Sequence, residues 1–156
     1  YIKTLHNQLK SGTSDSRKAW FSVGDYKQID NVVGDMETCP AAKVHEEMVK
    51  LLTQYNATGK TLTDIIDFHV KFERIHPFQD GNGRVGRLIM LKECLKYGHT
   101  PFVIAENIRQ FYYLGLQDWN NGRQARLKDT CGTGQDVFKL GLKNFGYGHL
   151  VKEGEL

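Results

Sequence analysis

The strongest constraint on the fold is the helical spacing of apolar residues, which is clearest between Thr61 and Ile75. There Ile65, Phe68, Phe72 and Ile75 follow one another at intervals of three and four, and this spacing puts them on one face of a helix. Thr61 stands before the run as a suitable N-cap residue. The pattern predicts a helix with one buried face.

Similar spacing recurs along most of the chain, so we expect a mainly α fold. The stretch between Trp20 and Pro40 lacks it. That stretch carries Val23, Tyr26, Ile29, Val32 and Val33 among glycine and aspartate, which suits a short β-hairpin. Besides the segment above, the expected helices cover residues 2–9, 42–55, 84–98 with Gly98 as the residue that ends it, 105–119 and 136–145.

Size and composition are those of one compact globular domain. The 156 residues suffice to bury a core, and we expect a single domain over residues 1–156. Composition is 40% hydrophobic and 25% charged, which excludes a disordered or collagen-like chain. No apolar run approaches the roughly 20 residues of a membrane span. The net charge of +3, spread over mixed charges, argues against a nucleic-acid partner.

The cysteines and the first residue bear on where the chain belongs. Three cysteines without a CxxC pair favour reduced thiols and a cytoplasmic location over a disulfide framework or a zinc ribbon. The sequence opens at Tyr1 without an initiator methionine and has no signal peptide. We therefore expect a fragment of a longer protein.

The residues that carry chemistry lie between two helical segments, in the run His-Pro-Phe-Gln-Asp-Gly-Asn-Gly-Arg-Val-Gly-Arg at 76–87. Pro77 disfavours helical backbone at His76, so the imidazole should stand at the tip of the preceding helix. Phe78 is expected to anchor the loop in the core. Gly81, Asn82 and Gly83 allow successive N–H groups to curl into an anion site at the start of the next helix.

The other polar residues of this run suit a polyphosphate. Arg84 and Arg87 are three residues apart, so both can lie on one helix face and reach phosphate oxygens. Asp80 supplies one carboxylate, which together with phosphate oxygens is a common Mg²⁺ arrangement. His76 is mostly neutral near pH 7 and can act as a base. This set of groups indicates phosphoryl or nucleotidyl transfer.

Other interpretations of the run differ in how well they fit. It is not a Walker A loop, because the Lys-Ser/Thr pair is missing and a helix precedes it. It is not an EF-hand, because Val85 stands where the sixth position needs glycine. A metal site at His69 is disfavoured, because no third ligand has a suitable spacing. His69 is therefore expected to be a packing or surface residue. On spacing alone, a glycine-rich helix connector with surface arginines also fits.

The run resembles a known family signature. Residues 76–87 match in full the HxFx[D/E]GNGRxxR motif of the Fic domain family. The Gly-Asp-Tyr-Lys stretch at 24–27 and the residues from Val32 to Pro40 resemble the flap hairpin of that family. Residues 109–113 with Asn120 resemble its adenosine-contacting segment. The resemblance implies a compact Fic-like helical bundle with a short β-hairpin flap.

The resemblance also implies an activity, protein adenylyltransfer (AMPylation). His76 would deprotonate a Ser, Thr or Tyr hydroxyl of a target protein, which attacks the α-phosphate of the co-substrate ATP and releases pyrophosphate. Asp80 would hold the cofactor Mg²⁺. The phosphate-binding residues carried over from the family are Gly81, Asn82, Gly83, Arg84 and Arg87, with Asn82 contributing its side chain and backbone near the α-phosphate.

Two further sets of residues follow from the resemblance. Tyr112, Tyr113 and Asn120 would contact adenosine; alternatively, one tyrosine packs in the core and Asn120 caps its helix. The flap would dock an extended segment of the protein substrate by strand addition. Its residues are Val32, Val33, Gly34, Asp35, Met36, Glu37 and Thr38.

Alternatives remain within the family and beside it. UMP transfer is open, whereas the intact GNGR pattern disfavours phosphorylation, and a catalytically weak nucleotide-dependent binding module is the non-enzymatic alternative. The family's inhibitory motif, [S/T]xxxE[G/N]N, has no match; Glu106-Asn107 comes closest, but Phe102 occupies the Ser/Thr position. The inhibitory helix is then N-terminal to this fragment, or it belongs to a separate antitoxin-like partner, or such regulation is absent; we expect the first. We expect no nucleic-acid or membrane partner.

Overall fold

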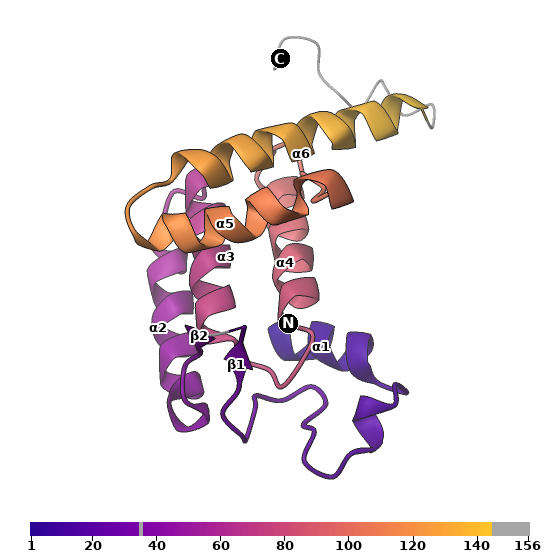
Figure 1. Ribbon diagram of the computed structural model, residues 1–156, viewed down its shortest axis with the longest axis vertical. Helices are drawn as coiled ribbons and strands as arrows, with labels where there is room; N and C mark the ends of the chain where they lie inside the picture. The colour runs from indigo at the N-terminus through magenta and orange to yellow at the C-terminus, as the bar shows by residue number, and fades with distance from the viewer. Residues whose placement is uncertain (35, 145–156) are drawn as a thin grey trace. The chain divides into compact units, whose positions relative to one another are not determined.

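The computed structural model describes residues 1–34 and 36–144 (Figure 1). The chain divides into two units, residues 1–93 and 94–156, and each is described by itself. Over the described residues, the elements are α1 (Ile2–Lys10), η1 (Asp15–Arg17), β1 (Val32–Val33), β2 (Met36–Glu37), η2 (Ala41–Lys43), α2 (Val44–Asn56), α3 (Leu62–Ile75), α4 (Asn82–Lys96), η3 (Glu106–Ile108), α5 (Arg109–Asn120) and α6 (Ala125–Asn144).

The fold is mainly α, as the spacing predicted. The helix expected after Thr61 is α3, and Thr61 caps it in a complete capping box with Asp64. Gly98 follows α4 with a positive φ of 75°, as a residue that ends a helix does. The helix expected at 136–145 was placed wrongly, because α6 already begins at Ala125.

The sequence pattern does not reveal the first part of α6, and the reason is physical. Its buried positions between 127 and 134 include Leu127, Thr130, Cys131 and Gly134, so the buried face carries few large apolar side chains. Glycine and threonine are also poor helix formers. Packing within its unit stabilises this part of the helix where intrinsic propensity does not.

The core of the first unit forms where α2, α3 and the first part of α4 pack together (Figure 1). Phe72 of α3 is fully buried, and its ring lies 6.5 Å from that of Phe78 in the following loop. The Tyr55 hydroxyl donates to Glu93 Oε2 at 2.8 Å and so joins α2 to α4. The loop at 76–81 therefore lies between two helices that are packed against a common core.

The hairpin is shorter than the sequence suggested. The antiparallel ladder pairs Val32 with Glu37 and Val33 with Met36, so each strand has two residues. The expectation of strand structure for Val23, Tyr26 and Ile29 was wrong, because residues 20–31 form turns and irregular backbone. Their side chains do not alternate between two faces of a sheet; Tyr26, for example, lies beside the Phe78 ring at 5.8 Å.

The second unit is built on the pair α5 and α6, which lie side by side (Figure 1). Gly115 permits their close approach, since a Cβ there would lie 2.9 Å from Leu127 Cβ. Asp118 of α5 pairs with Arg123 of the following turn at 3.2 Å and with Arg126 of α6 at 2.7 Å. The Val103 N–H donates to the Gly134 carbonyl at 3.1 Å and fixes the preceding segment against α6.

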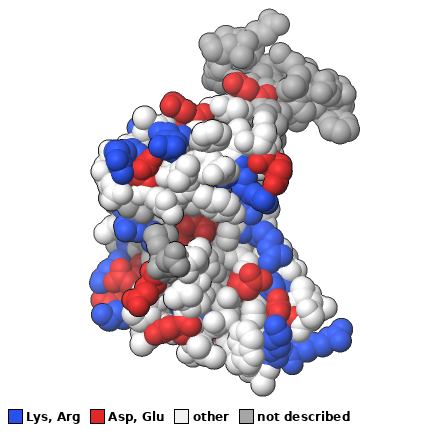
Figure 2. Space-filling view, viewed as in Figure 1, with Lys and Arg blue, Asp and Glu red and all other residues white. Residues whose placement is uncertain are grey.

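The surface carries charges of both signs. On the face shown in Figure 2, Lys and Arg side chains alternate with Asp and Glu over the described residues. Within those residues, no helix combines the length and the hydrophobicity that crossing a lipid bilayer requires.

The capping box of α3 provides a stability test. The Asp64 N–H donates to Thr61 Oγ1 at 3.2 Å, and the Thr61 N–H donates to Asp64 Oδ2 at 2.8 Å. We expect Thr61→Ala to lower the free energy of unfolding by about 1 kcal/mol, because it removes a helix cap. Urea denaturation measures this change. Thr63→Ala, on the exposed side of the same helix, is the matched control and should leave stability unchanged or slightly raised.

Candidate active site

His76 stands at the end of α3 in an unusual backbone conformation. Its φ of 51° and ψ of 60° are left-handed, which ends the helix at Ile75 as Pro77 predicted. The His76 N–H still donates to the Phe72 carbonyl at 3.0 Å. A left-handed residue other than glycine is uncommon and stores some strain, and such residues are frequent at functional sites.

The protonation of His76 follows from its contacts. Nδ1 lies 3.2 Å from the Glu73 carbonyl oxygen, which can only accept, so Nδ1 carries the hydrogen. Nε2 then holds a lone pair. Burial lowers the pKa of His76, and the nearby Lys27 ammonium lowers it further, against the opposing effects of its hydrogen bond to Glu73 and of Asp80. At pH 7 the ring is therefore a neutral imidazole with a basic Nε2.

Asn82 closes the loop on itself. The Phe78 N–H donates to Asn82 Oδ1 at 2.8 Å, and Asn82 Nδ2 donates to the Phe78 carbonyl at 2.8 Å. Asn82 is only 1% exposed, so both bonds lie in a shielded site. These bonds use one lone pair of Oδ1 and one hydrogen of the amide. For the predicted phosphate contact, Asn82 therefore has its backbone N–H and its second amide hydrogen.

His6 supports the same loop from α1, which the sequence gave no reason to expect. Its ring stacks on Phe78 with centroids 4.0 Å apart and planes 1° from parallel. Its Nδ1 accepts from the Gly24 N–H at 2.9 Å, so Nε2 carries the hydrogen and donates to the Asp80 carbonyl at 3.1 Å. Burial lowers the pKa of His6, which keeps this bridging tautomer neutral.

Asp80 is ion-paired on its Oδ2. Lys10 Nζ of α1, 3% exposed, approaches it at 2.6 Å, and Arg84 Nη2 approaches it at 3.1 Å. Partial burial acts to raise the pKa of this carboxyl, but Lys10, a hydrogen bond from the Gly81 backbone and Arg84 together outweigh that effect and hold the pKa below its usual value. Lys10 also pairs with Asp15 at 2.8 Å. Asp80 is thus an ionised carboxylate, half exposed, at the start of α4.

These groups fit a magnesium ion only as one that a nucleotide brings with it. Within residues 1–34 and 36–144, no three His, Cys, Asp or Glu side chains gather as a potential metal site. Mg²⁺ commonly binds through one or two carboxylates together with substrate phosphates. Asp80 satisfies the protein's part of that arrangement.

The glycines of the loop are required by their neighbours. Gly81 has a φ of 86°, and a Cβ there would lie 3.2 Å from Leu9 Cδ2 of α1. A Cβ at Gly83 would lie 3.1 Å from Arg87 Nη1, so the Arg87 guanidinium lies over the first turn of α4. At Gly86 a Cβ would lie 2.7 Å from Glu73 Oε1. The backbone at the N-terminal end of α4 is therefore closely packed, and at Gly83 it is partly exposed.

Arg84 and Arg87 point to different partners, although both start from the first turns of α4. Arg84 pairs with Asp80, whereas Arg87 lies close enough to the buried His69 and Glu73 to lower the pKa of each. Burial is the larger influence on both; it lowers the pKa of His69 and raises that of Glu73. His69 is thus a packing residue, one of the two predicted alternatives.

Lys27, like His6 and Lys10, is a residue that the sequence did not single out for the site. Its backbone N–H donates to the Pro77 carbonyl at 2.8 Å, and its Nζ donates to Asn31 Oδ1 at 2.7 Å and to Thr38 Oγ1 at 2.6 Å. Asn31 Nδ2 in turn donates to the Phe78 carbonyl at 3.2 Å. A cation that is 1% exposed therefore joins both ends of the hairpin to the loop.

The predicted flap residues form the tip of this hairpin. Val32 and Val33 are exposed, Gly34 has a φ of 59°, and Thr38 closes the base through Lys27. The backbone of Met36 and Glu37 forms β2, and Asp35 lies outside the described residues. Docking of a target on this hairpin remains a prediction.

The predicted adenosine residues lie in the second unit. Tyr112 of α5 is 1% exposed and belongs to the core, whereas Tyr113 beside it is 53% exposed. Asn120 is the last residue of α5, and its side chain lies outside what the structure describes. Their contact with a nucleotide remains a prediction, with Tyr112 matching the alternative that one tyrosine packs inside.

Comparison with known proteins identifies relatives of this chain. A model of the Fic/DOC family matches residues 1–94, more than half of the chain. The chain is 44% identical over 54 residues to a protein adenylyltransferase Fic from Aedes aegypti. That stretch is 35% of this chain and 11% of the relative, so the matched region spans about a tenth of the relative's length.

Solved structures of two proteins resemble the whole fold. A Fic family protein from Desulfovibrio desulfuricans G20 has a TM-score of 0.70 and 25% identity, with 97% of this chain and 48% of that chain covered. Fic-1 from C. elegans has a TM-score of 0.71 and 19% identity, with 93% of this chain and 43% of that chain covered. The second likeness concerns the fold alone.

The protonation of His76 can be measured directly. Long-range ¹H–¹⁵N NMR spectra should show the Nδ1–H tautomer near pH 7 and a titration midpoint below 6.5. Lys27→Met should raise that midpoint, because it removes a neighbouring positive charge. Lys27→Arg keeps the charge and is the matched control. An unchanged midpoint in folded Lys27→Met protein would show that this cation does not act on His76.

Proposed function

The chain belongs to the Fic/DOC family, and we propose that it is a protein adenylyltransferase that transfers AMP from Mg²⁺-bound ATP to a Ser, Thr or Tyr hydroxyl of a target protein. The observation that carries the proposal is His76, whose Nδ1 is engaged by the backbone and whose Nε2 keeps a lone pair. The similarity to proteins named protein adenylyltransferase supports it. Because the similarity spans a tenth of such a relative, the activity of the whole protein is part of the proposal.

In the proposed reaction, His76 acts as general base. The proton of the target hydroxyl passes to Nε2 while the hydroxyl oxygen attacks the α-phosphorus of ATP. The bond between the α-phosphorus and the oxygen bridging to the β-phosphate breaks, and pyrophosphate leaves with that electron pair. Burial and the Lys27 ammonium both keep His76 neutral, which is the form able to accept the proton.

The start of α4 would bind the phosphates. Backbone N–H groups of Gly81, Asn82 and Gly83 lie where the helix dipole favours negative charge. Arg84 and Arg87 would add charge-assisted hydrogen bonds to the β- and γ-phosphates. Arg84 is exposed and pairs with Asp80 through one nitrogen, so a polyphosphate can compete for it.

Asp80 would hold the Mg²⁺ that accompanies ATP. When bound, this ion neutralises charge on the phosphate oxygens and on the departing pyrophosphate. The cations Lys10 and Arg84 keep Asp80 ionised, so the carboxylate is ready to act as a ligand. Lys10 is itself nearly buried, and it would hold the carboxylate at the loop.

The remaining proposed contacts are those with the target segment and with the adenosine of ATP. The hairpin from Val32 to Thr38 would pair with an extended target segment, since a strand of two residues leaves backbone groups for strand addition. Of the two tyrosines, the exposed Tyr113 keeps the adenosine contact that the resemblance implies. Asn120 keeps it on the resemblance alone. Inhibition by a helix outside this chain or by an antitoxin-like partner would act on the phosphate-binding arginines.

Replacement of the base tests the proposal. With α-³²P-ATP, Mg²⁺ and a cell lysate, the chain should label itself or a target, and His76→Ala should reduce labelling by about 10²-fold or more. ATP affinity, measured by calorimetry, should be retained, because the base does not bind phosphate. His45→Ala removes an exposed histidine and is the control. Label from γ-³²P-ATP alone would indicate phosphorylation, and label from α-³²P-UTP would indicate UMP transfer.

Replacement of the metal ligand tests a separate part of the proposal. Asp80→Asn should raise the Mg²⁺ concentration for half-maximal labelling by about ten-fold or more, and EDTA should abolish labelling. Asp15→Asn is the matched control, because it removes the other carboxylate that pairs with Lys10 and leaves Asp80 in place. An equal effect of the two substitutions would place the role of Asp80 in holding Lys10 and not in holding Mg²⁺.

A further inference from the structure

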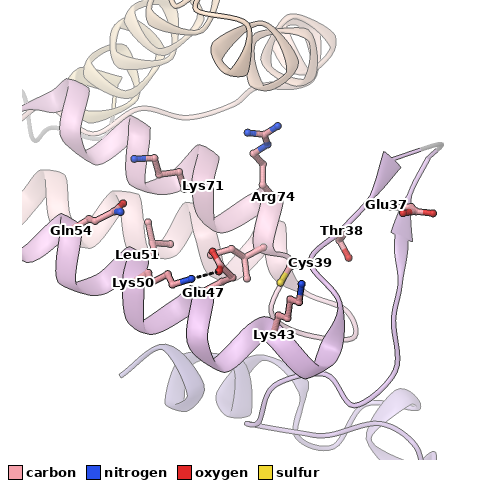
Figure 3. Close-up of a pocket in the computed structure, with 11 residues that line it drawn as sticks. Glu37, Thr38, Cys39, Lys43, Glu47, Lys50, Leu51, Gln54, Lys71 and Arg74 are labelled. Atoms are coloured by element: carbon pink, nitrogen blue, oxygen red, sulfur yellow. Dashed lines mark hydrogen bonds and ion pairs between the residues drawn. The ribbon is translucent and has the colours of Figure 1, made fainter.

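A cavity lies beside the hairpin, away from the residues assigned to the phosphates. Its volume is about 550 Å³, and it lies between residues 37–39 at the end of the hairpin, α2 and the last turns of α3 (Figure 3). Its lining includes Thr38, which closes the hairpin base, and Ile75, which directly precedes His76. The cavity is thus adjacent both to the proposed docking strand and to the proposed base.

Most of the charged groups that line this cavity are cationic. Four lining residues are basic and two, Glu37 and Glu47, are acidic. Lys50 is neutralised by Glu46 at 2.7 Å and by Glu47 at 2.8 Å, and Lys71 by Asp67 at 2.8 Å.

Two cations remain without a carboxylate. In the part of the chain that the structure describes, neither Lys43 nor Arg74 forms an ion pair, and both are exposed. They border the cavity on the sides of α2 and α3 (Figure 3). Within the described residues the lining acid Glu37 also forms no ion pair, so the lining groups without an ion pair are two cations and one acid. The excess of positive charge among them is complementary to an acidic group.

Helix electrostatics explain one of these cations but not the other. Arg74 lies in the last turn of α3, where a positive charge interacts favourably with the helix dipole. Lys43 is the last residue of η2, where a positive charge is favourable, and also the N-cap residue of α2, where it is unfavourable. These two effects of Lys43 oppose each other.

We propose that this cavity binds an acidic side chain of the target segment, so that the protein selects hydroxyls with Asp or Glu a few residues away. The inference rests on the proposed function, because it identifies the class of substrate for that site. In an extended segment alongside β2, every second side chain points to the same face, at about 3.3 Å per residue. Side chains two or four residues from the hydroxyl can then face Lys43 and Arg74.

Peptide binding tests the inference without any transfer of AMP. The probes are fluorescently labelled 11-residue peptides of alanine and glycine with a central tyrosine and with Glu, Gln or Lys two and four residues to each side. We expect the Glu peptide to bind about ten-fold more tightly than the Gln peptide, as two exposed ion pairs would allow. Fluorescence anisotropy measures the affinities. The ratio should fall as the ionic strength rises, because exposed charges are screened.

Variants assign the preference to the two cations. Lys43→Gln combined with Arg74→Gln should bring the ratio close to one, while Arg74→Lys should keep most of it. Lys3→Gln combined with Lys18→Gln changes the net charge equally, on exposed lysines outside the cavity, and should leave the ratio unchanged. Thermal unfolding checks that each variant is folded.

Three results would overturn the inference: equal affinities of the Glu and Gln peptides, a preference that survives the double substitution, or no binding of the Glu peptide up to millimolar concentration. None of them bears on adenylyl transfer, which is measured with α-³²P-ATP. If the transfer assay fails and the peptide preference is found, the cavity is an acidic-peptide site of a binding module.

Discussion

Two hydrogen bonds between the amide of Asn82 and the backbone of Phe78 are the constraint on which the site depends. They close the loop at the first residue of α4, in a position shielded from water where a hydrogen bond is hard to replace. With Phe78 held in this way, its ring enters the core beside Phe72. The same closure fixes the backbone of Gly81 to Gly83 at the helix start, and it keeps His76 at the end of α3.

The loop is also held from two earlier segments of the chain. His6 and Lys10 of α1 bind the backbone and the side chain of Asp80, and Lys27 binds the Pro77 carbonyl and the hairpin. The two lysines are nearly buried cations close to the loop. They act in different directions: Lys10 keeps Asp80 ionised, while Lys27 favours the neutral form of His76. The charges of the site therefore influence one another, and they come from segments up to 74 residues apart.

The local features of fold and site were open to prediction from the sequence. The capping box at Thr61 and the end of α3 before Pro77 depend on neighbours a few residues away, and the structure has both. The predicted burial of Phe78 is also confirmed, although its ring packs against His6 of a distant segment. The start of α6 could not be predicted, because the buried positions around Thr130 and Gly134 carry few large apolar side chains. The contributions of His6, Lys10 and Lys27 could not be predicted either, since no local pattern marks a residue whose partners lie in another segment.

The sequence by itself determined which groups stand in the loop and in what order. It also determined the end of α3 at His76, because proline restricts the backbone of the residue before it. The tertiary structure decided which tautomer His76 adopts, which cations surround Asp80 and which basic residues around the cavity lack a carboxylate. These properties depend on burial and on distances between charges. Both arise only when distant segments pack together and exclude water.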